Sequence, residues 1–191
     1  TETTETLNEI AKFEQICRAN GIAPPKMSKA EKLRFLKKSF ATHEGYHAVS
    51  HQILGHDPNK QPVNLGEVDM GHYKVDRSVL GPVNAVANDE LGAHGSSAAS
   101  SGKFIYFMLY ALHATASNDP NYNYADFILL NEIIHSPHLS VSVRNKLLDK
   151  LKSETLTIHD FVRATMKIPQ SALSEMGKRM TQLSVKDLSQ N

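Results

Sequence analysis

The chain of 191 residues has little of several features that commonly identify a partner or a compartment. Its one cysteine, Cys17, has no partner for an internal disulfide, which favours a reducing compartment such as the cytoplasm or an organelle interior. We expect this thiol to be a buried small apolar residue. Lysine and arginine number 21 against 20 aspartates and glutamates, so charge recommends neither nucleic acid nor a membrane surface as a partner.

Long apolar runs and a nucleotide-binding loop are also missing. The longest apolar stretch, 104–116, is too short to cross a bilayer and already contains His113. No segment of the form G-x-x-x-x-G-K-[ST] occurs, so the sequence predicts no ATPase module. The first residues, TETTETLNEI, lack the basic and apolar regions of a secretory signal. We therefore expect a soluble chain with no membrane span.

Apolar residues recur at helical spacing over most of the chain. The first such pattern covers about 4–19 and stops before NGIAPP. A second helix begins after Ser28, which with Glu31 has the form of a capping box, and runs to Gly55. Further helical patterns follow at 104–116, 124–134, 142–151, 158–166 and 171–180. The predicted fold class is therefore mainly α.

The segment between these helical stretches has a different character. From Asp57 to Val75, polar and apolar residues alternate around glycines, which predicts one or two short strands as a small β-hairpin insertion. Residues 76–102 contain SSAASSG, which we expect to be a flexible connection or flap. We therefore predict a single domain over 1–191. Its parts are an N-terminal helix and linker (1–27), a motif helix (28–56), strands and a flexible loop (57–102), and C-terminal helices (103–191).

The residues with the clearest chemistry are His43, Glu44 and His47, which form the pattern H-E-x-x-H. On a helix, residues four apart are rotated by about 40° and lie about 6 Å apart along the axis, so both imidazoles can reach one zinc ion. Zinc would lower the pKa of a bound water and polarise a peptide carbonyl, with Glu44 as the general base. The pattern predicts a Zn²⁺-dependent hydrolase acting on a protein or peptide.

The motif histidines share a helix face with Leu36 and Phe40, the side that we expect to face the core. Histidines on such a face are costly unless they are hydrogen-bonded or ligated, although a solvated face with satisfied histidines is the simpler alternative. His51 continues the same face but lies about 12 Å from His43 along the axis, much farther than a zinc–nitrogen bond of about 2 Å allows. We interpret His51 as a surface histidine or one that supports a ligand from behind.

The residues around the motif resemble a known family. HEGYHAVSHQILGHDP, followed by KQPVNLGEVDMGHY, is similar to the peptidase domain of the FtsH family of ATP-dependent zinc metalloproteases. NKLLDKLKSETLTIHDF resembles the C-terminal helical segment of that domain. The likeness spans about 40–165 and is weak at 76–116, and the pair Gly45–Tyr46 departs from the small residues usual in the family motif. The resemblance implies a zincin-like helical metallopeptidase domain, here without the ATPase module.

In that family the third zinc ligand is an aspartate at the start of a later helix, often in a stretch like ASND. ATASND offers Asp119, but Pro120 follows and gives Asp119 the character of a helix N-cap. Asp126 opens DFILLNEII, which has an apolar face for packing, so we predict Asp126 as the third ligand and Asp119 as the alternative. Without a motor, such a peptidase would cleave exposed segments or depend on a partner protein or an oligomer.

Two other interpretations stay open. E-x-x-H occurs at 44–47 and again at 132–135, which reproduces the paired motif of ferritin-like di-iron carboxylate bundles. Such a bundle also needs acidic residues from other helices, and Asp89 or Glu90 would have to serve although neither lies in a convincing helical pattern. The simplest interpretation of the second pair is solvated residues at a helix end. The other alternative is a non-catalytic helical binding module whose histidines are structural.

Overall fold

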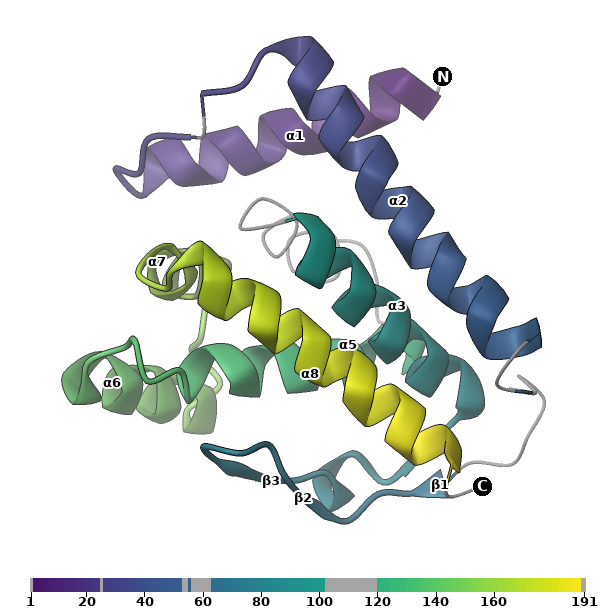
Figure 1. Ribbon diagram of the computed structural model, residues 1–191. Coiled ribbons are helices and arrows are strands. Elements are labelled where there is room, and N and C mark those ends of the chain that lie inside the picture. The colour runs from purple at the N-terminus through teal and green to yellow at the C-terminus, as the bar shows by residue number, and fades with distance from the viewer. Residues whose placement is uncertain (1, 25, 53–54, 56–62, 102–119, 190–191) are drawn as a thin grey trace.

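The computed structural model describes residues 2–24, 26–52, 55, 63–101 and 120–189 (Figure 1). Within these ranges the protein is mainly helical, which confirms the predicted class at this level. The helices are α1 (Glu2–Ala19), α2 (Lys29–Gln52), the 3-10 turn η1 (Ser78–Leu80), α3 (Ala85–Ser101), α5 (Pro120–Ile134), α6 (Val141–Lys152), α7 (Ile158–Met166) and α8 (Gln170–Ser189). No helix in the described part of the chain combines the length and apolar character needed to cross a bilayer.

The first two helices begin and end close to their predicted positions. The capping box before α2 is present, because the Ser28 backbone N donates to Glu31 Oε2 (2.7 Å) and the Glu31 backbone N donates to Ser28 Oγ (3.2 Å). Cys17 is fully buried in a small cluster with Leu36, as predicted for a small apolar residue. Phe40 is 50% exposed, so the prediction that it faces the core is wrong.

The strands form two short antiparallel pairs. β1 (Val63–Asn64) pairs with β4 (Pro82–Val83), and β2 (Glu67–Asp69) pairs with β3 (Lys74–Asp76). In the second pair, Val68 lies opposite Val75 and both are buried, while their neighbours along each strand are exposed. The predicted small strand insertion is confirmed, and β4 extends it beyond the predicted range.

The segment predicted to be flexible is instead a central helix. α3 lies between α2 and α8 in Figure 1 and also packs against α5. The small side chains of SSAASSG serve this packing: Ser97 and Ala98 are each 1% exposed. A Cβ added to Gly95 would lie 2.7 Å from the Gly177 carbonyl oxygen on α8. The prediction of a flexible loop is therefore wrong for the described residues 76–101, where η1 and β4 precede α3. The small residues of α3 let helices approach closely rather than freeing the chain.

The remaining helices follow the predicted order and complete the core. α5 begins at Pro120, the first helical position where proline is favoured, and so starts earlier than predicted. α6 starts after Ser140, whose side chain accepts from the Val143 backbone N, and α7 starts with a capping box of Thr157 and Asp160. α8 runs nine residues past its predicted end, to Ser189. The predicted helix at 104–116 lies outside the described residues.

Candidate metal centre

Helices α2 and α3 face each other and bring titratable side chains together from positions about 45 residues apart. Three histidines follow one another on successive turns of α2, and α3 contributes two acids and a histidine. Their possible ligand atoms form two groups, each within 4.8 Å: His43, Glu90 and His94, and His47, His51 and Asp89. The cluster thus contains both motif histidines and an acidic pair that the sequence analysis did not assign to the zinc site.

The close approach of α2 and α3 depends on Gly92. A Cβ at this position would lie 2.0 Å from Tyr46 Cζ, so the tyrosine ring occupies the space of the missing side chain. Tyr46 is buried, and its hydroxyl is within 2.7 Å of Ser184 Oγ on α8. Ser39 and Ser97 are hydrogen-bonded across the same interface. Small residues on α3 therefore determine how near the histidines of α2 come to the acids of α3.

The innermost atoms of the cluster have the spacing of ligands around one ion. His43 Nε2 and His47 Nε2 are 3.1 Å apart. Glu90 places Oε2 at 3.5 Å from His43 Nε2 and Oε1 at 3.8 Å from His47 Nε2. Neighbouring ligands of a tetrahedral zinc ion with bonds of 2.0–2.1 Å are about 3.3 Å apart. His43 and Glu90 belong to the first group and His47 to the second, so one ion held by all three would lie between the two groups.

Asp89 orients the second motif histidine. Asp89 Oδ2 lies 2.5 Å from His47 Nδ1, and since an ionised carboxylate only accepts, this hydrogen bond places a proton on Nδ1. In the neutral imidazole, Nε2, which lies 3.1 Å from His43 Nε2, then carries the lone pair. The hydrogen bond with Asp89 raises the pKa of His47, against the effect of burial and with the help of the negative charges of Asp89, Glu90 and Glu44. A carboxylate behind a histidine is the usual support of a metal ligand.

His51 contacts the same carboxylate from the outer side. Its Nε2 is 3.0 Å from Asp89 Oδ2, and its side chain is 44% exposed while that of Asp89 is 5% exposed. His51 shares a ligand group with His47 and Asp89, whereas His43 belongs to the other group. Asp89 therefore accepts from two histidines, and its position is held from both.

The other predicted site residues have different outcomes. Glu44 is exposed on α2 beside His43. Asp126 is partly buried inside α5 rather than at its start, because the helix begins at Pro120, and it belongs to neither group. Asp119 lies outside the described residues. Asp89 and Glu90 on α3 lie beside the motif histidines, at 2.5 Å from His47 Nδ1 and 3.5 Å from His43 Nε2, respectively. Glu90 and His94 are four positions apart, as are His43 and His47. On a helix this spacing places both side chains on one face, which is the sequence signal for Glu90 and His94 as a pair.

The second E-x-x-H pair lies elsewhere and has another role. Glu132 is fully buried and accepts from Arg179 Nη2 (2.5 Å) and from the Tyr73 hydroxyl (2.9 Å). The His135 ring stacks on Tyr73 with centroids 4.7 Å apart. The interpretation of this pair as solvated helix-end residues is therefore wrong for Glu132. Its carboxylate is occupied by Arg179, which gives the di-iron interpretation no support.

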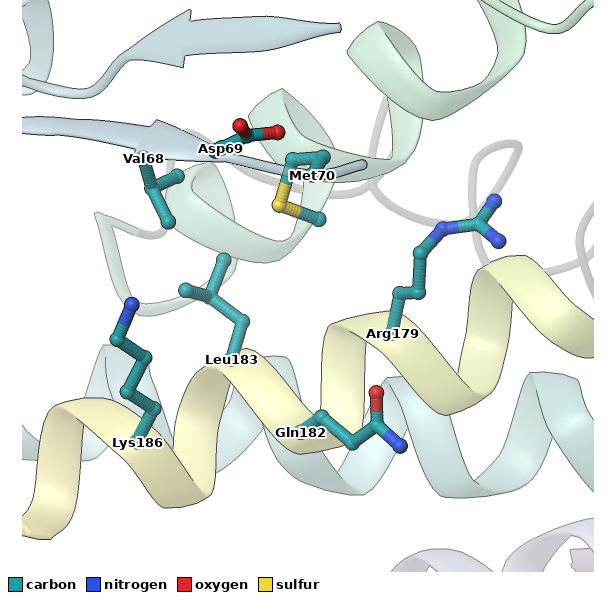
Figure 2. A pocket seen from close by; sticks show the side chains of 7 residues that line it. All are labelled: Val68, Asp69, Met70, Arg179, Gln182, Leu183 and Lys186. Atoms are coloured by element: carbon teal, nitrogen blue, oxygen red, sulfur yellow. The ribbon is translucent and has the colours of Figure 1, made fainter. Parts of the chain in front are cut away.

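A cavity of about 260 Å³ lies between β2 and α8 (Figure 2). Figure 2 shows Leu183 and Lys186 extending from α8 toward Val68 and Asp69 of β2 and the following residue Met70, with Arg179 and Gln182 beside them on α8. The cavity shares no residue with the two metal-ligand groups. It is therefore a separate feature of the surface.

Comparison with known proteins gives no family assignment: no family model, curated protein or solved structure matches the chain. The resemblance to the FtsH family therefore depends on the sequence of segments 43–58, 60–73 and 145–161 alone.

Proposed function

We propose that the protein is a zinc-dependent metallopeptidase in which His43, His47 and Glu90 hold the metal and Glu44 is the general base. The observation that carries this proposal is the 3.1 Å separation of His43 Nε2 and His47 Nε2. Glu90 lies beside both nitrogens, with Oε2 3.5 Å from the first and Oε1 3.8 Å from the second. Two histidines and one glutamate are a ligand set of catalytic zinc sites, in which water takes the fourth position. In this proposal Glu90 takes the place that the sequence analysis gave to Asp126.

The protein's own residues would each have a defined part in hydrolysis. A bound zinc ion supplies Lewis acidity, which acidifies a water molecule and polarises the scissile carbonyl. Glu44 accepts the proton of the attacking water as the new C–O bond forms, and returns it to the leaving nitrogen as the C–N bond breaks. Asp89 keeps the Nδ1 proton of His47 in place, so that Nε2 continues to face the metal.

The substrate class follows from the same features. Glu44 is exposed, so a peptide backbone can approach it from solvent. The 191 residues contain no phosphate-binding loop of an ATPase that could unfold a protein substrate. We therefore propose exposed or unfolded protein segments as substrates, reached directly or through a partner chain.

The test is hydrolysis of an unfolded casein by the purified full chain. We expect activity that is lost on chelation and restored by zinc. Glu44→Gln should retain zinc and lower the rate by about 100-fold or more, because it removes the base but no ligand. His43→Ala should lose both zinc and activity. Activity that survives Glu44→Gln, or a fully zinc-loaded wild type without activity on casein or a mixed peptide library, would reject the peptidase.

A further inference from the structure

We propose that His94 is a fourth protein ligand of the same metal ion. The ion is then held by two pairs of residues, each spaced four apart on a helix: His43 and His47 on α2, and Glu90 and His94 on α3. This inference rests on the proposed metal centre, and it adds a ligand that a three-ligand peptidase site does not have.

The distances around His94 support ligation. Its Nε2 is 3.4 Å from Glu90 Oε2, the same oxygen that lies 3.5 Å from His43 Nε2. An N–H···O hydrogen bond is normally 2.7–3.2 Å long, whereas two ligands of one zinc ion are separated by about 3.3 Å. His43, Glu90 and His94 all offer atoms within 4.8 Å of one another. The 3.4 Å separation is therefore compatible with two ligands that share one ion.

The surroundings of His94 hold its ring in a fixed orientation. Its side chain is 5% exposed, and the ring packs against His43 at a centroid distance of 4.8 Å and edge-on against Tyr122 at 5.6 Å. The next residue, Gly95, packs on α8, so α3 is fixed from that direction too. A ring that is fixed before binding loses little conformational freedom when it ligates a metal.

With four protein ligands, a tetrahedral zinc ion would have no position left for the water that catalysis requires. His94 is buried, whereas Glu44 is exposed, so water would enter as a fifth ligand from the side of Glu44. Zinc in catalytic sites can expand to five ligands. We therefore infer a five-coordinate resting centre rather than a tetrahedral one.

The competing role for His94 is support of Glu90 through an N–H group. Glutamine at this position keeps an N–H donor of similar reach but lacks the imidazole nitrogen. His94→Gln therefore separates the two roles. If His94 only donates to Glu90, the glutamine variant should bind the metal as tightly as wild type does. If His94 ligates the ion, the glutamine variant should bind it weakly.

The experiment uses the metal-free full chain, titrated with Co²⁺ and, in competition with a chelator, with Zn²⁺. We expect one Co²⁺ per wild-type chain with the weak visible absorption of a five-coordinate ion. In His94→Ala the absorption should intensify toward that of a four-coordinate ion, and zinc affinity should fall about tenfold or more. His94→Gln should also bind zinc weakly. His138→Ala is the matched control, because His138 is an exposed histidine that lines a cavity away from the metal-ligand groups, and it should behave like wild type.

Two results would overturn the inference while leaving the peptidase proposal in place. One is a wild-type spectrum and affinity in His94→Ala, and the other is full recovery in His94→Gln. If His94→Ala does not fold, the glutamine variant of similar size decides alone. A wild type that binds no metal would instead overturn both the metal centre and this inference.

Discussion

Asp89 decides which nitrogen of His47 is available to a metal. The carboxylate is almost completely buried and lies within hydrogen-bonding distance of His47 Nδ1 and His51 Nε2. Without it, the neutral imidazole of His47 could carry its proton on either nitrogen, and Nε2 would not always be available to a metal. The orientation of the ligand His47 therefore depends on Asp89, a residue that need not touch the metal.

We predict that Asp89→Asn lowers zinc affinity about 10- to 100-fold, because the amide supports the Nδ1 proton of His47 less strongly. The measurement is competition with a chromophoric chelator at fixed pH. Asp149→Asn, an exposed change on α6, is the control and should leave affinity unchanged. Equal affinities for Asp89→Asn and wild type would show that Asp89 does not orient a ligand.

Two residues are candidates for the third ligand: Glu90 in the proposed centre and Asp126 in the sequence analysis. Substitutions at the two positions should affect zinc affinity differently. We predict that Glu90→Gln lowers zinc affinity by at least tenfold, because a neutral amide is a much poorer zinc ligand than a carboxylate. Asp126→Asn should bind zinc like wild type, since its side chain belongs to neither ligand group. The same competition assay measures both. Loss of binding in Asp126→Asn with retention in Glu90→Gln would return the third-ligand role to Asp126.

At the scale of elements, the contact of α2 with α3 positions the whole cluster. Tyr46 lies against Gly92, and its ring takes the space that any larger residue would need. Tyr46 has the largest side chain within the motif segment 43–47. Gly92 explains how this chain accommodates the larger ring, because the bulk on one helix is matched by a missing side chain on the other.

We predict that Gly92→Ala lowers both thermal stability and zinc affinity, because the new Cβ would overlap Tyr46 and force α2 away from α3. Thermal unfolding and the zinc competition assay measure the two effects. Adding Tyr46→Ala should recover part of the zinc affinity, since it removes the overlap. Gly45→Ala is the matched control: it has open space and should keep wild-type zinc affinity. Unchanged zinc affinity in Gly92→Ala would contradict the argument.

The helices that the sequence predicts correctly have one apolar face or a clear cap. α7 is an example, with its Thr157–Asp160 capping box and a buried face that includes Phe161. α3 lacks such a face because it is buried against α2, α5 and α8, so its small residues resemble a flexible linker in composition. Glu90 and His94 were missed for this reason. His43, Glu44 and His47 could be identified because their spacing depends only on local helix geometry.

At the scale of the whole molecule, a buried ion pair joins the strand region to the C-terminal helices. Arg77, which follows β3, donates to both carboxylate oxygens of Asp187 on α8 (2.9 and 2.8 Å) and to the Tyr124 hydroxyl on α5 (2.7 Å). Arg77 and Asp187 are 6% and 4% exposed. No local pattern predicts this network, because its members lie 47 to 110 positions apart.

We predict that Asp187→Ala costs about 3–5 kcal/mol of unfolding free energy, because it leaves the Arg77 charge buried without its counter-ion. Tyr124→Phe should cost less, about 1.5–3 kcal/mol, since the ion pair remains while the hydroxyl's hydrogen bonds from Arg77 and to Asp187 are lost. Urea unfolding of the metal-free chain measures both. A smaller cost for Asp187→Ala than for Tyr124→Phe would mean that the ion pair does not hold these elements together.

In the proposed centre, α2 and α3 hold one zinc ion through imidazole nitrogens and a carboxylate. X-ray absorption at the zinc edge of the zinc-loaded full chain reports these ligands. We expect one zinc per chain, nitrogen and oxygen neighbours at about 2.0–2.2 Å, and the outer-shell scattering of at least two imidazole rings. A spectrum with oxygen neighbours alone and no imidazole scattering would contradict it.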